Sequence, residues 1–286
     1  MASMRDIQRR KLSVESTGQI TKAMKLVSTV KLQKARGRAE SSKPYFEGMY
    51  DTVASVLARS GNINHRFLKS SPDKKKAVIV ITSNRGLAGG YNSNIIKLIA
   101  RNEEFSKDNV VLYTVGRKGK DGLASKGYSV KEDYSDVIDN PLFSDAMEIS
   151  EDVLKAFENG EIGEIYLAYT VFKNTVSHIP TMKKLLPVSV DEHQLSEEEK
   201  SVPMNYEPNE EEVLDLIIPK YISSLVFGAL VEAVASENGA RMTAMDSATS
   251  NADEMISELS LLYNRARQSS ITQELTEIIA GAEAIN

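Results

Sequence analysis

The C-terminal quarter of the chain carries the pattern of one long amphipathic helix, running from Pro208 to Asn286. Within it, apolar and small residues alternate steps of four and three, which is the heptad spacing of a left-handed coiled coil. These positions, called the seam below, are Val231, Ala235, Asn238, Met242, Met245, Thr249, Ala252, Ile256, Leu259, Tyr263 and Ala266. Because small and polar side chains replace a ladder of leucines, the seam predicts a soft contact with its partner.

Beyond Ala266 the heptad positions become polar, and a different apolar stripe begins. The stripe, called the tip stripe below, consists of Ile271, Leu275, Ile278 and Ala282. Seventy helical residues would extend for roughly 105 Å, about twice the diameter of a compact protein of this size. The pattern therefore predicts a helix that projects from its domain, pairs with a partner as far as Ala266 and continues alone.

The first sixty residues are the expected partner of this helix. Residues 1–40 hold ten basic and three acidic side chains, a net charge of +7, whereas residues 207–286 hold four basic and fourteen acidic ones, a net charge of −10. Opposite charge favours pairing of the two ends of the chain as an antiparallel hairpin. Apolar residues on a helical period predict the inward face, namely Ile7, Ile20, Met24, Val27, Val53 and Leu57.

Between the two helical ends the pattern predicts an α/β domain with a mostly parallel sheet. Expected strands are Ala77–Thr82, Val110–Val115, Ile165–Phe172 and a returning Lys183–Val190, and expected helices are Asn92–Phe105 and Leu142–Phe157. The predicted fold class is therefore α/β with long helices: an antiparallel coiled coil of the N- and C-terminal helices and a central Rossmann-like domain. The expected divisions are residues 1–60, a linker 61–76, the domain 77–190, a linker 191–208 and residues 209–286.

One loop of this domain suggests enzymatic chemistry. Ser83–Asn92 (SNRGLAGGYN) follows the first strand and precedes a helix, where a Rossmann fold holds its phosphate loop. Its glycines do not match the G-x-G-x-x-G spacing, so a tight turn or contact loop is the favoured interpretation. The basic segment Gly116–Lys120 is interpreted as a solvated turn after the second strand.

Composition excludes several other functions. The chain has no cysteine, which removes disulfides and thiolate metal sites, and its three histidines, His65, His178 and His193, are scattered. We therefore expect no metal, no cofactor and no catalytic site. The basic N-terminal helix lacks interleaved aromatic residues, which argues against nucleic acid. With a net charge of −5, no signal peptide and no apolar run of membrane-spanning length, the chain is expected in the cytoplasm unless a partner holds it at a surface.

Four segments resemble the gamma subunit of bacterial rotary (F-type) ATP synthases, and the resemblance extends from end to end. The segments are ITKAMKLVSTVKLQKAR (Ile20–Arg36), ITSNRGLAGGYN (Ile81–Asn92), ENGARMTAMDSATSNA (Glu237–Ala252) and YNRARQSSITQELTEIIAGAEA (Tyr263–Ala284). The cysteine-bearing insertion of plastid relatives is missing, which indicates a bacterial type without thiol regulation.

The resemblance implies a non-catalytic rotor shaft. Its paired helices would pass through a hexamer of three alpha and three beta subunits that hold the nucleotides. Its central domain would form a foot on the membrane-embedded c ring and the epsilon subunit, at the cytoplasmic face of the cell membrane. Rotation would couple hydrogen-ion transport to ATP synthesis or hydrolysis.

The resemblance also implies roles for individual residues. Contacts with the beta subunit are expected at Met24, Lys25, Arg241 and Gln268, and contacts with the c ring or epsilon at Tyr206 and Glu207. The tip stripe, Ile271, Leu275, Ile278 and Ala282, is expected in an apolar bearing. Two other hypotheses remain open from the residues alone: a Rossmann-type nucleotide-binding enzyme with coiled-coil arms, and a free-standing coiled-coil scaffold.

Overall fold

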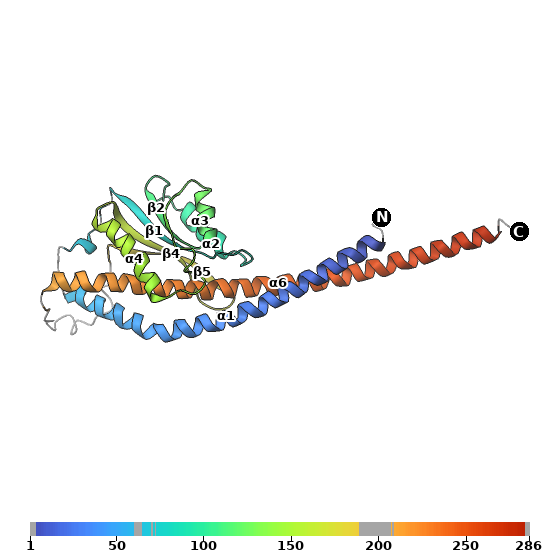
Figure 1. Cartoon of the computed structure of the whole chain (residues 1–286), viewed down its shortest axis with the longest axis horizontal. Helices are drawn as coiled ribbons and strands as arrows, with labels where there is room; N and C mark the ends of the chain where they lie inside the picture. Colours follow the sequence, from blue (N-terminus) through green and yellow to red (C-terminus); the bar gives the residue numbers. More distant parts are fainter. Residues whose placement is uncertain are drawn as a thin grey trace. The chain divides into compact units, whose positions relative to one another are not determined.

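The computed structural model describes residues 4–59, 65–69, 71, 73–188, 207 and 209–283. Contacts divide the chain into two compact units. The paired-helix unit comprises Met1–Ser28 and Met242–Asn286, and the α/β unit comprises Thr29–Arg241. The elements, labelled in Figure 1, are α1 (Met4–Arg59), the short 3-10 helix η1 (Arg66–Leu68), β1 (Lys75–Ile81), α2 (Tyr91–Ala100), β2 (Val110–Val115), α3 (Arg117–Ala124), β3 (Ser129–Asp133), α4 (Phe143–Glu158), β4 (Ile162–Phe172), β5 (His178–Leu186) and α6 (Glu210–Glu283).

In the paired-helix unit, α1 and α6 run antiparallel. The hydroxyl oxygens of Thr21 and Thr249 are 2.8 Å apart. One turn further along α1, the Lys25 ammonium lies 2.5 Å from the Asp246 carboxylate, so residue numbers rise in one helix as they fall in the other. The antiparallel pairing predicted from the two ends of the chain is confirmed for this unit.

The seam of α6 faces its partner as its spacing predicts. In the paired-helix unit Met245, Ala252 and Leu259 are buried and the other seam positions are half-buried. Residues between them, such as Asp246 and Leu261, are exposed. Beyond Ser270 all the described side chains of α6 are exposed, including the tip stripe, which agrees with the predicted change of surroundings after Ala266.

The predicted inward face of α1 is wrong at two positions. Ile20 is 58% exposed and Val27 is 57% exposed, whereas Gly18, Thr21 and Ser28 are buried against the partner. The reason is close approach of the two helices: a Cβ on Gly18 would lie 3.3 Å from the Cβ of Ala252. Small and polar residues therefore occupy the contact, and the side chains of Ile20 and Val27 point to solvent.

The α/β unit contains a five-stranded sheet with the order β3-β2-β1-β4-β5. The first four strands are parallel, and β5 pairs antiparallel with β4. The expected strands at 77–82, 110–115 and 165–172 correspond to β1, β2 and β4, and the returning strand is β5. The sequence analysis missed two neighbouring elements, α3 and β3. The basic segment at 116–120, interpreted as a solvated turn, is instead the start of α3.

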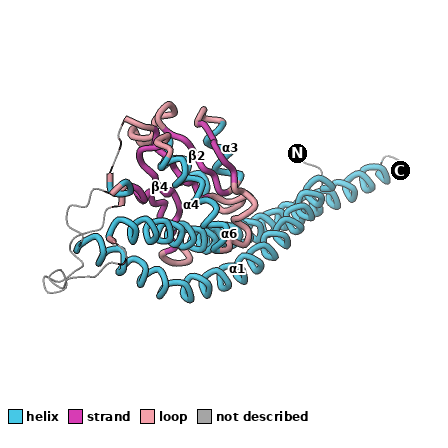
Figure 2. The backbone as a smooth tube through the Cα atoms, turned by 60° about the vertical axis from the view of Figure 1, so that its left-hand side comes forward, coloured by secondary structure: helices cyan, strands magenta, loops and turns pink. Residues whose placement is uncertain are grey.

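The two faces of the sheet are covered by different helices (Figure 2). Alternate residues of β1 point to opposite faces, as the pleat of a strand requires. Ala77, Ile79 and Ile81 pack with α4 and with the buried stripe of α6. Val78 and Val80 pack with α2 and α3 on the other face. Because every residue of β1 from Ala77 is buried, this strand reads as a continuous apolar run.

Within the α/β unit, α6 is a core helix. Its residues Leu214, Ile218, Ile222, Val226 and Leu230 are fully buried in the same cluster as β1 and α4. By length and composition α6 contains a stretch apolar enough to cross a membrane, contrary to the sequence-based expectation. Half of that stretch is buried inside the protein, where α6 contributes to the core of the α/β unit.

Candidate functional site: the glycine loop and its contact with α6

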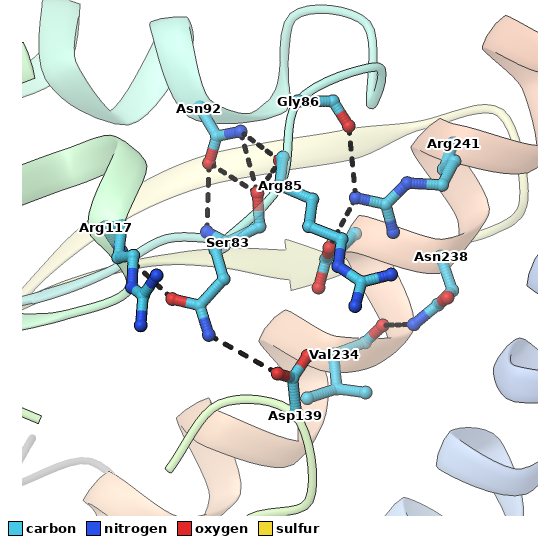
Figure 3. A network of polar contacts seen from close by, with 11 residues as sticks. Ser83, Arg85, Gly86, Asn92, Arg117, Asp139, Val234, Asn238 and Arg241 are labelled. Atoms are coloured by element: carbon cyan, nitrogen blue, oxygen red, sulfur yellow. Dashed lines mark hydrogen bonds and ion pairs between the residues drawn. The ribbon is translucent and has the colours of Figure 1, made fainter. Parts of the chain in front are cut away.

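The loop Ser83–Asn92 begins where β1 ends and is folded by its own side chains (Figure 3). Asn92, in the first turn of α2, reaches back to the start of the loop. Its Oδ1 accepts hydrogen bonds from the Ser83 backbone N–H at 2.9 Å and from the Ser83 hydroxyl group at 3.0 Å. Its Nδ2 donates to the carbonyl of Arg85 at 3.5 Å. The loop is therefore closed at its base by one asparagine.

A second side chain ties the loop to the segments that follow β2 and β3. Nδ2 of Asn84 donates to the Ser135 carbonyl at 2.8 Å, and its Oδ1 accepts from the Arg117 backbone N–H at 3.1 Å. Thr82, just before the loop, accepts through Oγ1 from the N–H of Gly119 at 2.9 Å. Since these donors and acceptors are used inside the chain, the loop has the character of a contact loop, the interpretation that the glycine spacing favoured.

The start of α3 lies very close to Thr82 at the end of β1, and two glycines make this possible. Gly116 has φ +105°, in the region that favours glycine, and a Cβ there would lie 2.2 Å from the Thr82 carbonyl oxygen. A Cβ on Gly119 would lie 2.6 Å from Thr82 Oγ1. The glycines of this basic segment therefore let the β1 and β2 ends pack together.

Arg241 of α6 joins the loop to the helix. Its terminal nitrogen Nη2 donates to the Gly86 carbonyl at 3.3 Å and to the Glu237 carboxylate at 2.6 Å (Figure 3). The side chains of Arg241 and Glu237 are only 11% and 13% exposed. A shielded ion pair of this kind is stronger than a solvated one, because the surrounding protein screens it less than water does.

Tyr91 lies buried beside this pair. Burial raises the pKa of its phenol well above the usual value; the Glu237 carboxylate raises it further, and the Arg241 guanidinium opposes the shift. The phenol oxygen makes no hydrogen bond to any of the described residues. Tyr91, the last loop residue but one, is therefore held in place by packing of its ring.

Leu87 stands at the tip of the loop in an unusual conformation. It is the one described residue other than glycine with a positive φ, at 63°, and its side chain is 64% exposed. A left-handed backbone costs a leucine roughly 1–2 kcal/mol relative to the ordinary region. The neighbouring peptide carbonyl, that of Gly86, is the one that Arg241 binds.

The structure places the other predicted contact residues on separate surfaces. Met24 and Lys25 lie on α1 in the paired-helix unit, where Lys25 pairs with Asp246. Gln268 and the tip stripe are exposed on α6 in the same unit, whereas Arg241 belongs to the α/β unit. Glu207 is exposed, and Tyr206 lies outside the described residues. Sequence reasoning missed Glu237 and Leu87; the spacing of four between Glu237 and Arg241 was the available signal for the first.

The described residues hold no group of three or more histidine, aspartate or glutamate side chains suited to a metal ion. His65 is buried and accepts from the Phe67 N–H through Nδ1, while its Nε2 lies 3.0 Å from Asp215. His178 packs its ring against Phe172, with ring centroids 6.0 Å apart. His193 lies outside the described residues. His65 is thus held by hydrogen bonds to Phe67 and Asp215, and His178 by ring packing.

Comparison with known proteins covers the whole chain. The family model described as ATP synthase matches residues 3–285. An ATP synthase gamma chain of Lachnoclostridium phytofermentans is 66% identical over 293 aligned residues, covering 100% of both chains. A gamma chain of Acetobacterium woodii, described as sodium ion specific, is 44% identical and covers 99% of each chain.

Solved structures agree with the observed fold. A chain of the central stalk and c ring of the Tetrahymena thermophila mitochondrial ATP synthase matches with a TM-score of 0.59 and 26% identity, covering 80% of this chain and 99% of the other. A chain of the Euglena gracilis mitochondrial ATP synthase matches with a TM-score of 0.72 and 18% identity, covering 99% and 94%. From the family model and the full-length relatives, the chain belongs to the family of ATP synthase gamma chains.

Proposed function

We propose that this chain is the central shaft of a rotary ATP synthase, turning inside a hexamer of three alpha and three beta subunits. The observation that carries the proposal is the paired-helix unit, in which a soft antiparallel seam ends and α6 continues as an unpaired helix. An unpaired helix with exposed Ile271, Leu275 and Ile278 has apolar surface that needs a partner. A bearing formed by the surrounding hexamer supplies one.

The exposed face of α1 supports the same arrangement. Leu12, Ile20, Leu26 and Val27 are all more than half exposed in the paired-helix unit, although α1 is already paired with α6. Their apolar surface lies outside the seam and is available to the surrounding subunits. Met24, Lys25 and Gln268 are the proposed contacts with the beta subunit, and Lys25 supplies a cation that is still partly solvated beside Asp246.

Arg241 is also proposed as a beta-subunit contact, through the part of its side chain that stays exposed. Within the chain its Nη2 is already used by Glu237 and Gly86, so a beta-subunit acceptor would bind the remaining N–H groups of the guanidinium. Tyr206 and Glu207 are the proposed contacts with the c ring and epsilon.

In this proposal the chain itself is non-catalytic, and the nucleotides bind to the alpha and beta subunits. It is peripheral to the membrane, held through the c ring at the cytoplasmic face. The coupling ion is proposed to be the proton. A relative at 44% identity is described as sodium ion specific, so the ion is a property to be measured on the assembled complex.

The test is reconstitution of ATPase activity from alpha and beta subunits with and without this chain. The informative variant replaces Ile271, Leu275 and Ile278 by asparagine, and the matched control changes Thr272 and Thr276 to asparagine and Glu274 to glutamine on other faces of the same helix. We expect rotation-coupled activity to fall for the apolar set and to persist for the control. Activity that is independent of this chain, or equal loss in both variants, would contradict the proposal.

A further inference from the structure

We propose that Glu237 and Arg241 form a latch that positions the glycine loop Ser83–Asn92 on α6, within the α/β unit. The two residues act here as positioning residues within the chain. The proposal rests on the proposed shaft function only for its mechanical consequence, because the latch itself can be measured on the isolated chain.

One nitrogen atom of Arg241 joins the helix to the loop. Nη2 of Arg241 carries two N–H groups, and its two acceptors belong to different elements: the Glu237 carboxylate lies on α6 and the Gly86 carbonyl lies on the loop. The i,i+4 pairing with Glu237 directs the guanidinium along the surface of α6 towards the loop. One side chain thus bridges helix and loop.

The ion pair between Glu237 and Arg241 is shielded from solvent. Both members of the pair are nearly buried, and the buried ring of Tyr91 lies beside them. A solvated ion pair contributes little, whereas loss of one partner of a shielded pair leaves a charge without compensation. Replacement of either Glu237 or Arg241 should therefore release the loop, and the two effects should not add.

The loop is bonded to segments at the ends of three strands. Its base is closed by Asn92, and Asn84 joins it to Ser135 after β3 and to Arg117 at the start of α3. The loop is therefore a rigid extension of the sheet. A bond from α6 to this loop transfers force to the ends of β1, β2 and β3 together, whereas a bond to a flexible loop would not.

Under torque the latch has a specific function. The α/β domain already packs against α6 through an apolar cluster that includes Val226 and Leu230. The interlocked side chains of that cluster already oppose rotation of the domain about α6, because a close-packed core yields little. Gly86 and Arg241 lie outside the cluster, and we assign to the bond between them the resistance of the glycine loop itself to displacement along α6.

The latch is tested on the isolated full chain by hydrogen exchange of the backbone amides. Arg241→Gln and Glu237→Gln should each speed exchange of residues 86–91 about tenfold, given the strength of hydrogen bonds to charged groups. The double variant should match the singles. Arg241→Lys should restore part of the protection, because the ammonium can still pair with Glu237 but lacks the guanidinium geometry. The Ser83 amide, held by Asn92, is the internal control and should not change.

Tyr91→Phe is the matched control variant, because it alters a buried side chain beside the latch that makes no hydrogen bond with the described residues. It should leave loop exchange unchanged. Unchanged exchange in both Arg241→Gln and Glu237→Gln would overturn the latch, as would the same loosening in Tyr91→Phe. Neither outcome depends on assembly into a synthase.

The mechanical consequence is tested in the assembled complex. Ion pumping per ATP hydrolysed should fall in Glu237→Gln, while hydrolysis without an ion gradient should change less. Loosened loop exchange with unaltered pumping per ATP would overturn the mechanical role of the latch. Failure of the wild-type chain to support any activity with alpha and beta subunits would instead contradict the shaft function.

Discussion

The hydroxyl groups of Thr21 and Thr249 meet across the antiparallel helices at 2.8 Å, in the middle of a seam of small residues. Each hydroxyl is also within reach of a carbonyl on its own helix, Gly18 at 3.0 Å and Met245 at 2.8 Å. Each hydroxyl can donate its proton either to the other hydroxyl or to the carbonyl on its own helix, and it can switch between the two as the helices move. A polar contact that has such alternatives tolerates small changes in helix rotation better than an interlocked apolar pair.

The first prediction concerns this pair. Thr21→Val and Thr249→Val should each lower the free energy of unfolding by about 0.5–1.5 kcal/mol, because each removes one partner of a shielded hydrogen bond. The double variant should lose less than the sum, since both hydroxyls are then gone. Denaturant unfolding measures all three. Thr17→Val, which removes a similar helix-internal bond at an exposed site, is the control and should be nearly neutral.

A second prediction compares two glycines of the α/β unit. A Cβ on Gly239 would lie 2.7 Å from His178 Nε2 and 3.3 Å from the Phe172 ring, so Gly239→Ala should destabilise the chain despite the higher helix propensity of alanine. Gly48→Ala, where a Cβ would have open space, should stabilise by up to about 1 kcal/mol. Thermal unfolding of both variants decides the matter. Similar shifts would indicate that His178 moves aside freely.

The third prediction is a pH dependence carried by His178. Burial lowers the pKa of its imidazole below the usual value of 6.5, so the unfolded chain binds the proton more readily than the folded one. The stability is therefore complete above pH 6.5 and is lost as the pH falls through the folded pKa. His178→Gln should flatten the change in unfolding free energy between pH 7.5 and pH 5. An equally steep change in this variant would assign the effect to other groups.

A fourth prediction separates strain from function at Leu87. Leu87→Gly should relieve the left-handed backbone and raise the free energy of unfolding by about 1 kcal/mol. If the exposed side chain is retained for contact with another subunit, the same variant should lower ATPase activity in the assembled complex. Leu87→Asn, which tolerates this backbone but is polar, is the comparison. A more stable variant with full activity would assign no contact to the Leu87 side chain.

Hydrophobic periodicity predicted the elements in which large apolar residues face the core. It located β2 from Val110 to Val115, which is a continuous apolar run, and the seam of α6 as far as Ala266, which keeps regular heptad steps. It failed on α1, where the inward positions are Gly18, Thr21 and Ser28. A scale that weights apolar side chains cannot recognise a contact whose closeness depends on side chains being small.

The missed elements α3 and β3 have physical reasons of the same kind. In α3, Gly119 and Gly122 lower helix propensity, yet a Cβ on Gly119 would lie 2.6 Å from Oγ1 and 2.8 Å from Cγ2 of Thr82, so packing favours glycine there. In β3 only Val130 is apolar, as is typical of a short edge strand with solvent on most sides. Both elements form because of tertiary contacts, and these contacts leave no pattern in the local sequence.

The candidate site was predictable in part. The position of the loop after β1 followed from the sequence, and so did its character as a contact loop. Its partner did not, because Gly86 and Arg241 are 155 residues apart. Two residues so far apart in the sequence leave no local pattern that would indicate their pairing. Arg241 was expected instead to contact the beta subunit.

That loop lies at the end of the sheet where other open α/β proteins bind their ligands. In open α/β sheets the crevice at the carboxyl ends of the strands, where the order of connections reverses, is the usual place for a nucleotide. Here the reversal lies between β1 and β4, and the loop that leaves β1 at that point is bound by an arginine of the chain's own helix. The end of the sheet that other open α/β proteins leave free for a ligand is therefore taken up, in this chain, by a contact with its own helix.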